Sequence, residues 1–170
     1  MAHFKDLEKC DYFGGQLKDV LLAVGWLDKD HEFSQGKVSE VNMDLLKMYC
    51  EKPLWVHVFR GFHDCNLCET QGSRNDNKGV FSNAGLFGVQ KESGQLESGI
   101  GKRKSALNVF VPYKDKIFVA PENIVHYIIE HGYQPPNEFF DVLRSAPKPD
   151  QRKLIDELVK IGGNSFDPQK

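Results

Sequence analysis

Two cysteines separated by two residues, Cys65 and Cys68, carry the clearest chemical signal in this sequence. A Cys-x-x-Cys turn lets two sulfurs approach one ion, while backbone amides in the turn stabilise the negative charge on sulfur. Thiolates bind zinc strongly, and four-coordinate zinc needs four ligands. The pair therefore predicts half of a zinc site, to be completed by two ligands from elsewhere in the chain.

Three histidines are candidates for the remaining ligands. His63 lies two residues before Cys65, whereas His126 and His131 lie on a helix predicted near the C-terminal third of the chain. Residues five apart on an ideal helix point about 140° away from each other, so these two face one ion only if the last turn tightens or unwinds. Otherwise one of them binds and His63 completes the site. We predict a Cys2His2 zinc site whose fourth ligand is either His63 or His131.

Each histidine also has a simpler interpretation. His126 and His131 flank an apolar stripe, where a histidine is commonly a hydrogen-bonded residue at the core boundary. His131 alone would suit the partial negative charge at a helix C-terminus. Of the other candidates, Cys10 and Cys50 each stand alone and are predicted to be small buried side chains. His57 is assigned no function.

Other chemistries fit the sequence less well. A redox dithiol normally opens a helix, but a glycine-rich polar stretch follows Cys68. Nucleotide-binding and serine-hydrolase motifs are absent from the sequence. The remaining alternative is a zinc-dependent hydrolase, in which three protein ligands leave an open position for water and Glu122 or Glu130 acts as general base.

The elements that must position these residues follow from apolar patterns. A buried strand is expected within Val20–Leu27, and a helix capped by Ser39 is expected to bury Val41, Leu45, Met48 and Tyr49 and to end at Pro53. The β-rich run Leu54–Arg60 predicts a central strand leading into the cysteine pair.

The C-terminal half predicts a hairpin and three helices. The hairpin joins residues 106–111 to residues 116–120, and the first helix is expected to start at Pro121 and stop at Gly132. Two amphipathic helices follow, the second burying Leu154, Ile155, Leu158 and Val159. The predicted class is α+β, a small mixed or antiparallel sheet with helices packed on it. The order of cysteine knuckle, hairpin and ligand-bearing helix resembles a treble-clef zinc module.

Composition limits the possible functions. The 170 residues are 40% hydrophobic and 27% charged, which predicts one domain over 1–170 with a flexible glycine-rich loop at about 70–104. The formal net charge of -2 argues against a nucleic-acid partner. No apolar run is long enough to span a membrane, and the N-terminus lacks a secretory signal, so we expect a cytoplasmic protein. Its size and mild acidity suit a protein partner.

Three segments together support a family resemblance: "VGWLDKDHEFSQG", "RGFHDCNLC" and "APENIVHYIIEHGYQPPNEF". They resemble a set of small uncharacterised bacterial proteins with a GWLD segment followed by His, an RGFH-x-C-x-x-C segment and an HY-x3-HGY-x-PP segment. The resemblance implies that His63, Cys65, Cys68, His126 and His131 match the family pattern. It implies no known reaction. The long glycine-rich stretch departs from the shorter connection expected of that family.

Overall fold

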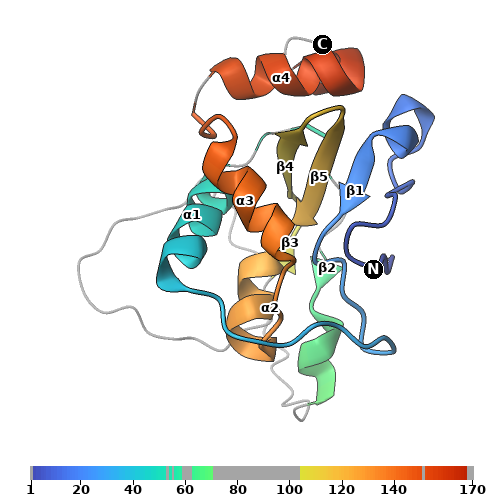
Figure 1. Ribbon diagram of the computed structural model, residues 1–170. Helices are drawn as coiled ribbons and strands as arrows, with labels where there is room; N and C mark the ends of the chain where they lie inside the picture. The colour runs from blue at the N-terminus through green and yellow to red at the C-terminus, as the bar shows by residue number, and fades with distance from the viewer. Residues whose placement is uncertain are drawn as a thin grey trace, which may run out of the picture.

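The computed structural model describes residues 2–52, 54, 56–58, 63–70, 104–150 and 152–167, with the backbone alone at 63, 64, 69, 70, 104 and 105. The predicted glycine-rich loop therefore lies almost entirely outside the described residues. Figure 1 shows the arrangement of the elements. In chain order they are η1 (Gly15–Asp19, a 3₁₀ helix), β1 (Leu21–Ala23), α1 (Glu40–Glu51), β2 (His63–Asp64), η2 (Asn66–Thr70), β3 (Lys104–Ser105), β4 (Asn108–Tyr113), β5 (Lys116–Pro121), α2 (Ile124–His131), α3 (Asn137–Ser145), α4 (Arg152–Gly162) and η3 (Gly163–Phe166).

The main sheet has three strands in the order β1-β5-β4. Strands β4 and β5 form the predicted hairpin, antiparallel with Phe110 opposite Val119, and β1 joins β5 in parallel with Leu22 opposite Phe118. A second sheet pairs β2 with β3, two residues each, in antiparallel fashion. In the described parts of the chain, a mixed sheet and four α-helices confirm the predicted α+β class.

Both faces of the main sheet are covered, which explains why its strands do not alternate between apolar and polar residues. Val111 and Phe118 face the cluster formed with α1, α2 and α3. Phe110 and Val119 face the opposite cluster, where Leu154 and Leu158 of α4 pack. Successive strand side chains point to opposite faces, so residues on alternate positions fill two separate cores.

Helix α1 begins as predicted, because the side chain of Ser39 accepts a hydrogen bond from the N–H of Asn42. The buried face differs from the prediction. Tyr49 is buried as expected, together with Leu46 and Cys50, whereas Val41 is 73% exposed. The apolar spacing located the helix correctly but set the centre of its buried stripe too near the N-terminus.

Two other expectations are wrong. Leu54 and residues 56–58 lie outside any strand, and His57 has a φ of 52°, which interrupts extended structure. Its ring instead packs against Phe110 and Phe166. The helix predicted from Pro121 begins three residues later, because Pro121 still pairs with Asn108 as the last residue of β5.

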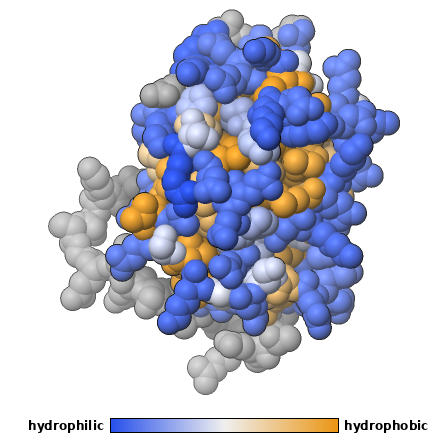
Figure 2. Space-filling view, in the orientation of Figure 1, coloured by the Kyte–Doolittle hydropathy of each residue, from blue (hydrophilic) through white to orange (hydrophobic). Residues whose placement is uncertain are grey.

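The last two helices, α3 and α4, occur where they were predicted. Leu154 and Leu158 of α4 are buried, while Ile155 and Val159 are half-buried at its margin. Across the described parts of the chain, every helix is too short or too polar to traverse a bilayer. Figure 2 shows a mainly hydrophilic face on which apolar side chains surface in separate patches.

Candidate metal centre

The cysteine knuckle lies beside helix α2, as Figure 1 shows for the segment that follows β2. Cys65 comes directly after β2, and Cys68 lies within η2. The pairing of β2 with β3, in which His63 lies opposite Ser105, anchors the strand that leads into the knuckle. The β4–β5 hairpin delivers the chain into α2 on the same side of the molecule.

Helix α2 places two histidines at its two ends, His126 in the first turn and His131 as the last residue. Gly132 ends the helix in the left-handed conformation, with a φ of 65° and a ψ of 22°. Its N–H bonds the carbonyl of Tyr127, five residues earlier, where an α-helix would use four. The N–H of Tyr133 bonds the same carbonyl, as at a Schellman-type helix end. At this end the rings of His126 and His131 lie close together, with centroids 5.1 Å apart.

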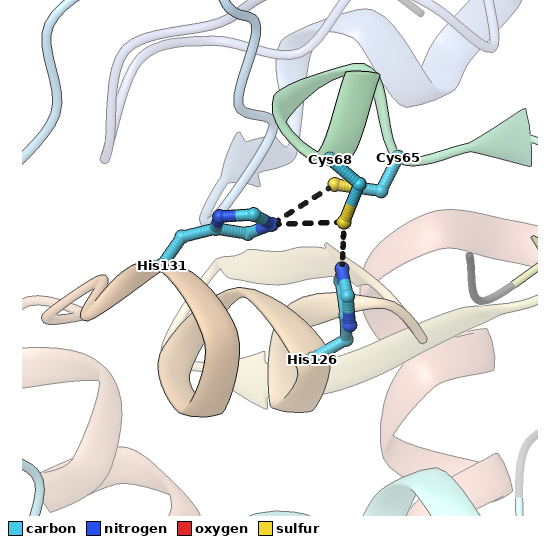
Figure 3. A group of neighbouring side chains, drawn as sticks. All are labelled: Cys65, Cys68, His126 and His131. Atoms are coloured by element: carbon cyan, nitrogen blue, oxygen red, sulfur yellow. Dashed lines mark hydrogen bonds between the residues drawn. The ribbon is translucent and has the colours of Figure 1, made fainter. Parts of the chain in front are cut away.

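Four side chains converge in the gap between the knuckle and the helix (Figure 3). The Sγ atom of Cys68 lies 3.2 Å from Nε2 of His126 and 3.4 Å from Nε2 of His131. The Sγ atom of Cys65 lies 3.3 Å from Nε2 of His131. All four ligand atoms lie within 4.8 Å of one another. These four are among the five candidates named from the sequence, and the structure brings them together.

The spacing of these atoms suits one tetrahedral ion. With Zn–S bonds of about 2.3 Å and Zn–N bonds of about 2.0 Å, tetrahedral angles place sulfur and nitrogen roughly 3.5 Å apart. The three S···N separations of 3.2, 3.3 and 3.4 Å are close to that value. Ordinary hydrogen bonds explain the cluster less well, because the Nε2 atom of His131 has one in-plane site and two sulfurs approach it.

Burial sets the protonation of the free side chains. Removal from water raises the pKa of the Cys65 thiol from 9.0 to about 11, since the low-dielectric surroundings disfavour a thiolate. Burial also lowers the pKa of His131, against the opposing charge of Glu130, and so favours the neutral imidazole that binds metal. A metal cation must therefore displace the proton of the Cys65 thiol, whereas burial already favours the neutral, metal-binding imidazole of His131.

The other predicted residues fall outside the cluster or outside its description. The side chain of His63 is not among the described atoms, so its part in the site stays a prediction. Cys10 and Cys50 are buried at 0% and 6% exposure, as expected of isolated cysteines. Within the described residues, the cluster contains neither Glu122 nor Glu130, the predicted general bases of the hydrolase alternative.

One contact of the knuckle was not predicted. Asn66, between the two cysteines, donates a hydrogen bond of 2.7 Å from Nδ2 to Oδ2 of Asp28. Asp28 belongs to the GWLD segment, which the sequence singled out without giving it a role. The contact joins residues 38 positions apart, and nothing in the sequence signalled it.

The fold and the cluster together define a small α+β domain with a Cys2His2 group that can hold a metal ion. The chain belongs to the family described as "Domain of unknown function (DUF7919)", which matches residues 2–144. That match includes all four residues of the cluster and ends within α3. No curated protein and no solved structure matches the chain.

Proposed function

We propose that this protein is a non-enzymatic domain in which a zinc ion, bound by Cys65, Cys68, His126 and His131, pins the knuckle to helix α2. The observation that carries the proposal is the convergence of two sulfurs and two imidazole nitrogens at near-tetrahedral spacing. In this proposal the knuckle, the β4–β5 hairpin and α2 form a treble-clef-like zinc module.

Zinc suits this donor set better than the other common metals. Two thiolates and two imidazoles in a tetrahedral arrangement are typical of structural zinc, whereas magnesium and calcium take oxygen ligands. The four ligand atoms would fill all tetrahedral positions. The hydrolase alternative requires an open position for water, so a four-ligand site favours a structural role.

The energetic role of such an ion would be local. A domain of this size buries enough apolar surface to fold around its own core, and both faces of the main sheet are already covered. The knuckle, in contrast, is held in the described part of the chain by the two-residue β2–β3 pairing, the hydrogen bond from Asn66 to Asp28 and the packing of Cys65 and Leu67 on the core, and the proposed ion would add a direct tie to α2. The ion would therefore order the knuckle and its attached strand, and the main sheet would survive its removal.

Metal analysis of ligand variants tests the zinc proposal. Untagged wild-type protein is expected to carry one zinc per chain, and Cys65→Ser, Cys68→Ser, His126→Ala and His131→Ala are expected to carry much less. Cys50→Ser is the matched control, because Cys50 is also buried but lies outside the cluster. His63→Ala distinguishes the two predicted fourth ligands, since its zinc content stays near one if His131 binds.

Two results would contradict the proposal. Stoichiometric zinc in Cys68→Ser would place the site elsewhere in the chain. Loss of zinc in the Cys65, Cys68 and His126 variants, together with retention in both His131→Ala and His63→Ala, would leave an open position and favour the hydrolase. A test of hydrolysis with the wild-type protein would then be the next step.

We further propose that the working surface of the domain binds a protein partner, as a regulatory or immunity-type protein would. Its size and mild acidity suit such a role. Ile129 is 59% exposed on the helix that carries the two histidines, which offers an apolar contact to a partner. An ordered zinc module would hold that side chain in a fixed place.

Affinity purification from the native cell tests the partner proposal. A tagged wild-type protein is expected to recover a specific protein that Ile129→Arg loses, while Lys153→Glu on the exposed side of α4 serves as the control. Equal recovery by Ile129→Arg would exclude the surface around Ile129.

A further inference from the structure

The GWLD segment, residues 25–28, touches both halves of the metal centre. At its C-terminal end, Asp28 accepts the 2.7 Å hydrogen bond from Asn66 in the knuckle. At its N-terminal end, the backbone of Gly25 packs so closely on α2 that an added Cβ would lie 3.0 Å from Cγ1 of Ile124. The segment therefore spans the distance between the element that carries the cysteines and the helix that carries the histidines.

The segment is held firmly between these two contacts. The indole of Trp26 is fully buried and donates from Nε1 to the carbonyl of Val119 in β5 at 3.1 Å. The N–H of Gly25 donates to Oδ1 of Asp6 at 2.9 Å, and Leu27 is 4% exposed. A segment fixed to the central strand in this way gives Asp28 a defined position relative to the sheet and α2.

The orientation of the Asp28 carboxylate is also fixed. Its Oδ2 atom accepts from Asn66, while its Oδ1 atom accepts from the N–H of Asp30 at 3.0 Å. The Nδ1 atom of His31 lies 3.6 Å from the same Oδ1. With both oxygens engaged and the side chain only 17% exposed, the carboxylate has little freedom to turn away from the knuckle.

We infer that Asp28 is a positioning residue for the metal centre: through Asn66 it holds the cysteine knuckle at the distance from α2 that the four ligands require. This inference rests on the proposed zinc site. Groups that orient metal ligands typically change metal affinity by about 10- to 100-fold when they are removed. Asp28 acts one residue away from Cys65, through the turn itself rather than through a ligand ring.

A double-mutant cycle on zinc affinity tests this role. Asp28→Ala, Asn66→Ala and the double variant are compared with wild type by competition with a chromophoric chelator. Asp30→Ala is the matched control, because Asp30 is an exposed neighbour that keeps its N–H bond to Asp28. Each single variant is expected to bind zinc about 10- to 100-fold more weakly, and the control is expected to match wild type.

The double variant is expected to lie within about twofold of the weaker single variant, because the two residues act through one bond. Cobalt(II) replaces zinc in a second measurement, and the visible bands of the Asp28→Ala complex are expected to shift from those of wild type. Unfolding of the metal-free proteins separates positioning from general stability: the loss of metal-free stability in Asp28→Ala is expected to be smaller than its loss of zinc-binding free energy.

Three outcomes would overturn the inference while leaving the zinc site in place. They are unchanged affinity in Asp28→Ala, additive losses in the double variant, and a loss of metal-free stability in Asp28→Ala that accounts for the loss of affinity. A wild-type protein that binds no zinc would overturn the proposed function and the inference together.

Discussion

Replacement of Gly25 by alanine probes the tightest contact between the GWLD segment and helix α2. Gly25 has a φ of 71°, a conformation that residues with a Cβ rarely adopt. An added Cβ would lie 3.0 and 3.1 Å from two side-chain atoms of Ile124 and 3.3 Å from Cε1 of Tyr133. Both neighbours are fully buried, so neither can move aside into solvent.

Two terms set the expected loss of stability. The left-handed backbone costs about 1–2 kcal/mol for a residue with a side chain. Overpacking of a filled core costs about 1–3 kcal/mol more. The sum of about 2–5 kcal/mol is a large part of the total stability of an ordinary domain, which is about 5–15 kcal/mol. Gly25→Ala should therefore fold only marginally.

Gly132→Ala is the matched control, because Gly132 has a φ of 65° but no atom within 4 Å of the added Cβ. It should lose only the backbone term, about 1–2 kcal/mol. Urea unfolding in the presence of a chelator measures both variants without a contribution from metal. If Gly25→Ala loses no more than Gly132→Ala, then Gly25 does not pack on α2 as described.

Three further predictions concern separate parts of the molecule. Ser39→Ala should lower the free energy of unfolding by about 1 kcal/mol, because the N–H of Asn42 loses its cap, and urea unfolding would show it; an unchanged midpoint would exclude the cap. Burial raises the pKa of Asp6 above its ordinary value of 3.8. Between pH 3.8 and the raised pKa, the native state therefore binds more protons than the unfolded state, and the stability of the protein falls as the pH rises through this window. Asp6→Asn, which keeps an acceptor for Tyr133, should remove this fall, and parallel pH profiles of the two proteins would contradict it. Since the pKa of Cys65 is about 11, zinc binding at neutral pH must displace at least the proton of this thiol, and calorimetry in buffers of different ionisation enthalpy should detect the released proton. The apparent zinc affinity should rise about tenfold per pH unit for each proton released. A zinc affinity that does not change with pH would refute this prediction.

Much of the fold could be predicted because its signals are local. The hairpin, α3 and α4 follow from apolar periodicity and from turn residues close in sequence. The strand predicted for Leu54–Arg60 was wrong because residues that favour β-strands are also common in buried chain without strand structure. Its described residues form irregular chain, in which the ring of His57 packs against Phe110 and Phe166 while Val58 is exposed. The parallel pairing of β1 with β5 depends on residues almost 100 positions apart and carries no local signal.

Part of the candidate site could also be predicted from the sequence, and part could not. Residue types and the Cys-x-x-Cys spacing gave five candidates, Cys65, Cys68, His126, His131 and His63, and the structure groups the first four. The choice between His63 and His131 was open because a regular 3.6-residue repeat points His126 and His131 about 140° apart, and the sequence does not show how their side chains lie at the end of α2. The link from Asp28 to Asn66 is a tertiary contact, and only the folded chain brings its two ends together.

X-ray absorption at the zinc edge tests the central claim most directly, because it counts the sulfur and nitrogen atoms around the ion in the purified wild-type protein. Four protein ligands from the knuckle and α2 predict two sulfurs at about 2.3 Å and two imidazole nitrogens at about 2.0 Å, with no bound water. A spectrum fitted by nitrogen and oxygen alone, or by a single sulfur, would contradict the proposed site.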